Sequence, residues 1–86
     1  MNILNRMKTF QLTIARVDMP VFDGPVVSVT VPGTAGEMTI LASHAPIISP
    51  LKAGTILIKK ENGEEESIGV DSGTLEMSYN QLTILV

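Results

Sequence analysis

Residues 55–70 read TILIKKENGEEESIGV, and this stretch decides the fold class. The pair Asn62-Gly63 lies between two strand-like runs, and Asn-Gly in that position is the strongest short-range signal for a β-hairpin. The turn brings Lys59-Lys60 near the acidic run 64–66, where opposite charges on facing strands contribute about 0.2–1 kcal/mol per pair. The charges are interpreted as a solvated face that protects a sheet edge. We therefore predict a hairpin with strands at 55–60 and 64–70.

Apolar and polar residues also alternate along residues 9–14 and again along 27–31. A period of two is typical of half-buried strands, and helical spacing is absent. Pro46 and Pro50 bracket a short apolar run and lack a backbone N–H, so we expect the run to lie at a sheet edge. Further strands are expected at 37–41, 74–78 and 82–86.

Turn signals separate these runs. Asp23-Gly24-Pro25 predicts a turn, as does Tyr79-Asn80-Gln81. Glycine falls at predicted turns at positions 24, 33, 36, 54, 63 and 73. Gly69 is different, because a glycine inside a strand predicts a bulge or the close approach of a neighbour. Many short strands with regular turn signals predict an all-β sandwich or barrel.

Composition limits the possible functions. A chain of 86 residues suffices for one domain, and 44% apolar residues with 17% charged residues argue against disorder. A net charge of −3 with six Lys or Arg residues and three aromatic residues gives no basis for nucleic-acid binding. Cysteine is absent, which excludes disulfides and thiolate ligands. No signal peptide is recognised, and no stretch approaches the roughly 20 apolar residues that span a bilayer.

Three features could be read as chemical sites. Ser43 precedes the single histidine, His44, but adjacent side chains in an extended segment point to opposite faces and do not form a catalytic dyad. One histidine without cysteine also gives no metal-site spacing. The turn 32–37 lacks the Lys-Ser/Thr ending and the following helix of a phosphate loop. Lys52 follows a leucine at a turn, as in carrier domains that expose a lysine for modification. We predict no catalytic, cofactor-binding or metal-binding residue.

Several blocks occur in the order seen in one known family. They are residues 7–14 (MKTFQLTI), 21–33 (VFDGPVVSVTVPG), 36–41 (GEMTIL), 44–46 (HAP), 51–54 (LKAG) and 72–77 (SGTLEM). Together they resemble the N-terminal β-sandwich domain of the epsilon subunit of rotary F-type ATP synthases. The resemblance covers roughly residues 7–86, and several blocks in one order are more specific than a single motif.

The resemblance implies a flattened ten-stranded β-sandwich without an active site or cofactor. It implies a central-stalk subunit that joins the gamma subunit to the polar loops of the c-ring and supports the coupling of ion-driven rotation to ATP synthesis. The subunit would be peripheral to the membrane, at the cytoplasmic face of the bacterial inner membrane. By position, the residues implied to face the c-ring are Gly36, Glu37, His44, Ala45 and Pro46.

The chain also departs from the family pattern. Ala42-Ser43 and Ala53-Gly54 stand where members often have Pro-Gly. Residues 1–6 precede the usual start, so we expect a flexible extension there, with Met7 as an alternative initiator and the domain at 7–86. Typical members continue beyond the position of Val86 into a two-helix domain, so nucleotide binding and inhibition by those helices are not carried over.

Two alternatives remain open at this point. The chain could be a lipoyl-type or biotinyl-type carrier domain modified at Lys52. It could also be a generic β-sandwich recognition module, or a small hydrolase in which Ser43, His44 and Glu37 converge in a pocket.

Overall fold

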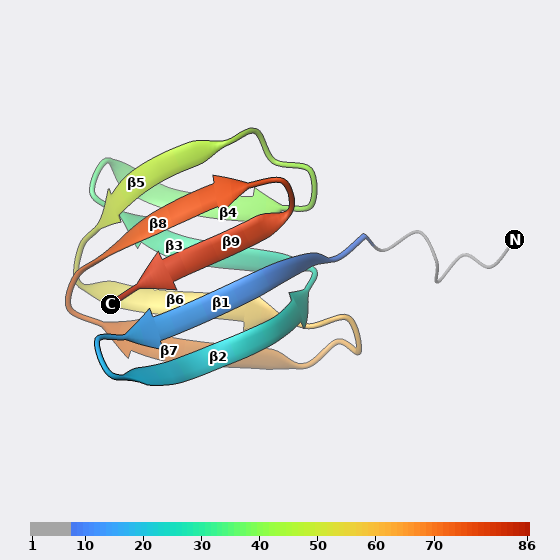
Figure 1. The fold of residues 1–86 in the computed structure, drawn as a ribbon, viewed down its shortest axis with the longest axis horizontal. Coiled ribbons are helices and arrows are strands. Elements are labelled where there is room, and N and C mark those ends of the chain that lie inside the picture. Colours follow the sequence, from blue (N-terminus) through green and yellow to red (C-terminus); the bar gives the residue numbers. More distant parts are fainter. Residues whose placement is uncertain (1–7) are drawn as a thin grey trace, which may run out of the picture.

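Nine β-strands and no helix make up the computed structural model over residues 8–86, the part of the chain that it describes (Figure 1). The extension expected at 1–6 and Met7 lie outside the described residues. The strands are β1 (Phe10–Arg16), β2 (Met19–Val26), β3 (Ser28–Gly33), β4 (Gly36–Leu41), β5 (Ile47–Leu51), β6 (Gly54–Lys59), β7 (Glu65–Val70), β8 (Gly73–Ser78) and β9 (Gln81–Leu85).

The strands form two packed layers. One layer has the order β2-β1-β9-β8-β5 and faces the viewer in Figure 1, and the other has the order β7-β6-β3-β4 and lies behind it. The layers are connected by hydrogen bonding where β3 pairs with β5, at the single pair Gly33 and Leu51. The predicted all-β sandwich is therefore confirmed. The strand count is nine instead of ten, because the segments that join these strands contain at most five residues each and form no further ladder.

The core lies between the layers and receives at least one side chain from every strand. On β1 the inward positions Phe10, Leu12 and Ile14 are buried and alternate with partly exposed polar residues, as the period of two predicted. The remaining buried apolar residues are Val26, Val29, Val31, Ile40, Leu51, Ile56, Ile58, Val70, Leu75, Met77, Leu82 and Ile84. No polar side chain among the described residues is fully buried, so the sandwich is stabilised mainly by apolar burial.

The predicted hairpin at 55–70 is confirmed. β6 and β7 pair antiparallel in regular register, and Gly63 takes a positive φ of 92° in the turn. Lys60 Nζ lies 3.1 Å from a carboxylate oxygen of Glu66, so the expected cross-strand charge pairing is present. Gly69 forms neither of the predicted features: its pairing with Thr55 is regular, and a Cβ added there would meet nothing within 4 Å.

The turn predicted at Asp23-Gly24-Pro25 is wrong, because these residues continue β2. Asp23 pairs with Thr13 and Pro25 pairs with Gln11 across the β1 ladder. The Asp23 carboxylate accepts hydrogen bonds from Gln11 Nε2 at 2.6 Å and Thr13 Oγ1 at 3.2 Å. A proline is tolerated because β2 is an edge strand. Pairing with β1 therefore overrides the local turn propensity.

Candidate partner-binding edge

Strand β4 forms one edge of the sandwich and connects the residues that were predicted to contact a partner. It pairs with β3 alone among the described strands, which leaves its other side without a ladder. Ile40 points inward and is fully buried, whereas Glu37, Thr39 and Leu41 are exposed on the outer surface. The edge therefore exposes alternate side chains and one row of backbone polar groups that make no ladder with another described strand.

The first end of β4 is a tight turn around Gly36. Gly36 has a φ of 138°, a conformation that favours glycine. Gly33 lies so close to the returning chain that an added Cβ would be 2.7 Å from the Gly36 carbonyl oxygen. The Thr34 amide also donates to the Pro50 carbonyl at 3.2 Å. This turn places the Glu37 side chain in solvent at the start of the strand.

The second end of β4 leads into loop 42–46, which carries the other predicted contacts. The His44 amide donates to the Leu41 carbonyl at 3.2 Å. The His44 ring lies with Nδ1 2.7 Å from the carbonyl oxygen of Ala45. Because a carbonyl can only accept, Nδ1 is the donor, and in the neutral ring Nε2 is then left as an acceptor for another group. Ala45 and Pro46 are exposed beside it.

Ser43 does not have the extended conformation that was assumed for it. Its φ is 65°, in the left-handed region, and its amide donates to Asn80 Oδ1 at 2.6 Å. The His44 ring is hydrogen-bonded to Ala45. The extended geometry on which the expectation of no Ser43–His44 dyad rested is therefore wrong, and the expectation itself stays a prediction. Sequence reasoning did not identify Asn80 as the partner of this loop.

The predicted contact residues form two groups, not one. Gly36 and Glu37 begin β4, and loop 42–46 follows its end. At the usual strand rise the four steps from Glu37 to Leu41 extend about 13 Å. The structure thus joins His44, Ala45 and Pro46 in one loop but separates them from Glu37 by the length of the strand. This separation also keeps Glu37 from converging with Ser43 and His44, as a hydrolase would require.

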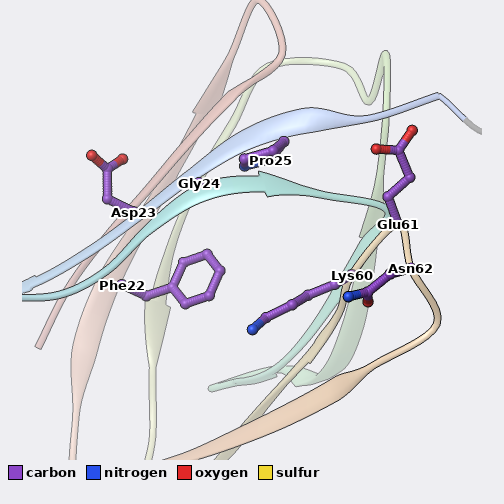
Figure 2. Close-up of a pocket in the computed structure, with 7 residues that line it drawn as sticks. All are labelled: Phe22, Asp23, Gly24, Pro25, Lys60, Glu61 and Asn62. Carbon is purple, nitrogen blue, oxygen red and sulfur yellow. The ribbon is translucent and has the colours of Figure 1, made fainter.

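An open groove lies on the opposite side of the molecule, between β2 and the β6–β7 turn (Figure 2). The Lys60 side chain points toward the Phe22 ring, with Nζ 5.7 Å from the ring centroid. This distance is within the range of a cation–π contact. Lys60 is also paired with Glu66. The groove's single lysine is thus already engaged in contacts within the chain.

Within residues 8–86 no group of three or more His, Asp or Glu side chains is arranged to hold a metal ion. The same part of the chain contains no helix that is long and apolar enough to cross a membrane.

Comparison with known families identifies the domain. A family model described as ATP synthase, delta/epsilon chain, β-sandwich domain matches residues 9–86. The chain belongs to this family. The resemblance drawn from the sequence blocks is therefore confirmed, and the epsilon interpretation is favoured over the carrier alternative.

The position of Lys52 in the delta/epsilon domain also argues against a carrier. A carrier lysine is presented at the tip of a hairpin, but β5 and β6, which flank Lys52, lie in different layers and do not pair with each other. The Lys52 amide donates to the Pro32 carbonyl at 2.9 Å, where the chain crosses between the layers.

This chain is similar to a bacterial epsilon chain. It is 39% identical over 79 residues to the ATP synthase epsilon chain of Bordetella petrii, a match that covers 92% of this chain and 56% of that protein. The chain thus spans little more than half the length of this curated relative.

Two solved structures share the fold. One is a chain in the cryo-EM structure of the Euglena gracilis mitochondrial ATP synthase, OSCP/F1/c-ring, with a TM-score of 0.87, 24% identity, and coverage of 91% of this chain and 50% of that one. The other is in the central stalk/c-ring structure of the Tetrahymena thermophila mitochondrial ATP synthase, with a TM-score of 0.76, 15% identity, and coverage of 92% and 63%.

Proposed function

We propose that this chain is the β-sandwich part of an epsilon subunit, a non-catalytic component of the central stalk that joins the gamma subunit to the c-ring. The observation that carries this proposal is the family match over residues 9–86, nearly the whole described chain. A two-layer sandwich with a continuous apolar core suits the role, because transmission of torque requires a body that does not deform.

The proposed ring contact runs along the β4 edge. Glu37 at one end offers a carboxylate to basic or amide groups of the ring loops, and His44 Nε2 at the other end offers an acceptor. Pro46 stiffens the loop that carries His44, which lowers the entropy lost on docking. Because these groups are separated by the length of β4, a single ring loop does not reach both, and we propose contact with neighbouring loops.

The proposed gamma contact is a row of residues, apolar except at one position, on the outer surface of the other layer. Ala15 pairs with Pro20 on one side and with Leu85 on the other, and the row continues through Thr74 to Pro50. Leu85 is 57% exposed. Exposed apolar side chains gathered on one surface are typical of an interface, and this row, apolar except at Thr74, crosses all five strands of its layer.

Co-purification with a cognate gamma subunit tests this assignment. We expect wild type to form a stable complex, and Leu85→Glu to lose it because a carboxylate would be buried in an apolar contact. Leu57→Glu is the matched control, since Leu57 is exposed on a strand of the other layer. Failure of wild type to bind gamma would refute the proposed function, whereas binding by both variants would refute only the position of the contact.

Proton pumping by reconstituted enzyme tests the ring contact. We expect Glu37→Ala combined with His44→Ala to weaken coupling while the domain unfolds at an unchanged denaturant concentration, because both side chains lie outside the core. Unchanged pumping would argue against the ring assignment.

The proposed location is the cytoplasmic face of a bacterial inner membrane, where the complex would hold this subunit without direct insertion. The bacterial relative supports this setting. Cell fractionation provides the test, because loss of the gamma subunit should release the chain from the membrane fraction.

A further inference from the structure

Asn80 makes two hydrogen bonds that connect three separate parts of the chain. Its side-chain Oδ1 accepts from the Ser43 amide at 2.6 Å, and its backbone carbonyl accepts from the Gln11 amide at 2.9 Å. Asn80 and Tyr79 have φ values of 58° and 52° in the two-residue turn between β8 and β9, as in a type I′ turn. Asparagine tolerates this conformation better than most residues, so its side chain is held in place by the turn.

The group that Asn80 contacts is itself in an unfavourable conformation. Ser43 has a positive φ of 65°, which a non-glycine residue retains only where surrounding contacts maintain it. Ser43 directly precedes His44, so a return of Ser43 to negative φ would redirect the His44 backbone and ring. The other hydrogen bonds of the loop are local: the His44 amide donates to the Leu41 carbonyl across a turn with Ser43 in its third position, and the His44 ring bonds to Ala45. The Asn80 side chain is the contact that reaches Ser43 from a distant part of the chain.

We propose that Asn80 is a positioning residue for the ring contact: its side chain holds loop 42–46 in the conformation that presents His44. This inference rests on the proposed function, since it concerns the loop assigned to the ring. Asn80 acts through Ser43, and its own side chain faces the loop. The presentation of His44 therefore depends on a residue that lies 36 positions later in the chain.

Two substitutions at one position separate the side-chain contact from the turn conformation. Asn80→Gly keeps the positive φ but removes the acceptor, whereas Asn80→Asp keeps both. We expect Asn80→Gly to weaken binding to purified cognate c-ring by roughly three- to tenfold, the range that follows from loss of one intramolecular hydrogen bond, and Asn80→Asp to bind within about twofold of wild type.

Asn62→Gly is the matched control. Asn62 Oδ1 accepts from the Glu64 amide at 2.9 Å, so this substitution removes the same kind of bond from a turn that does not contact loop 42–46. We expect wild-type ring affinity for Asn62→Gly. A loss equal to that of Asn80→Gly would overturn the proposal, because it would indicate a general loss of order.

Hydrogen exchange of the Ser43 amide and a double-mutant cycle provide readouts that a purely structural role would not change. We expect faster Ser43 exchange in Asn80→Gly alone, and we expect its binding defect to disappear in a His44→Ala background. Unchanged Ser43 exchange, or a defect that persists without His44, would overturn the positioning role. If wild type does not bind the ring, the proposed function fails, and exchange still reports whether the contact exists.

Discussion

The two ends of strand β4 are constructed in different ways. At the first end the positive φ falls on a glycine, Gly36, in a tight turn that also takes one hydrogen bond from the Thr34 amide to the Pro50 carbonyl. At the second end Ser43 takes a positive φ without being a glycine, and Asn80 from another hairpin stabilises it. The two groups proposed to face the c-ring thus differ in how a positive φ is accommodated: a glycine permits it at the first end, and a distant side chain contacts the strained serine at the second. Substitutions that act on one end, or on both, can test this difference.

The largest effect on stability is expected from a substitution in the middle of β4, the strand that joins the two ends. Ile40 is fully buried in the middle of β4, so Ile40→Ala should lower the free energy of unfolding by about 2–5 kcal/mol and weaken both ends. Leu41→Ala is the control, because Leu41 is 54% exposed and its change should stay within about 0.5 kcal/mol. Urea denaturation followed by circular dichroism measures both. Equal losses would show that burial does not control the stability of β4.

The next effect is confined to the first end. Gly36→Ala should lower the free energy of unfolding by about 1–3 kcal/mol, since alanine is strained at a φ of 138°. Gly69→Ala is matched to it, because a Cβ at either glycine meets nothing within 4 Å but Gly69 has no positive φ. Thermal unfolding should show a loss for the first variant only. Ser43 amide exchange should remain at the wild-type rate if the ends are independent.

A smaller effect on stability, an increase, is expected from a substitution in the turn between β8 and β9, which contacts the second end of β4. Tyr79 is 95% exposed and has a φ of 52°, so Tyr79→Asn should raise the free energy of unfolding by about 0.5–1 kcal/mol through relief of backbone strain. Val17→Asn is the control. Val17 lies in the two-residue turn between β1 and β2 and has no positive φ, so this substitution should give no gain in stability. Equilibrium denaturation in urea compares the two, and a destabilised Tyr79→Asn would indicate that the tyrosine makes a compensating contact.

The smallest expected quantity is the coupling between the ends. Because Glu37 and His44 are separated by the length of β4, their alanine substitutions should have additive effects on c-ring affinity, with a coupling free energy below about 0.5 kcal/mol. Surface plasmon resonance on immobilised c-ring, with the two single variants and the double variant, measures this term. A larger coupling would mean that one ring loop contacts both residues.

The sequence predicted most of the strands because their signals are local. Alternation along β1 and the Asn62-Gly63 turn were sufficient to place these elements, since side chains in a strand alternate between the two faces whatever lies beyond them. It did not predict β2 through Asp23-Gly24-Pro25, because that strand depends on pairing with β1 and on the hydrogen bonds that the Asp23 carboxylate accepts.

The candidate site was predicted only in part, for the same reason. Glu37, His44 and their neighbours were singled out by position within a resembled family, and the strand expected at 37–41 already places Glu37 and His44 at its opposite ends. Asn80 was predicted as part of a turn, but nothing in its neighbourhood of the sequence indicates a contact with Ser43.

The amino-acid sequence by itself determined the all-β class, the hairpin at 55–70 and the family, because each is encoded in short runs whose periodicity or residue order is read without knowing what packs against them. The tertiary structure alone decided that β2 is continuous through Asp23-Gly24-Pro25 and that the Asn80 side chain accepts a hydrogen bond from the Ser43 amide in the His44 loop. These features arise from hydrogen bonds and packing between distant segments, and such contacts form only when the two layers have come together.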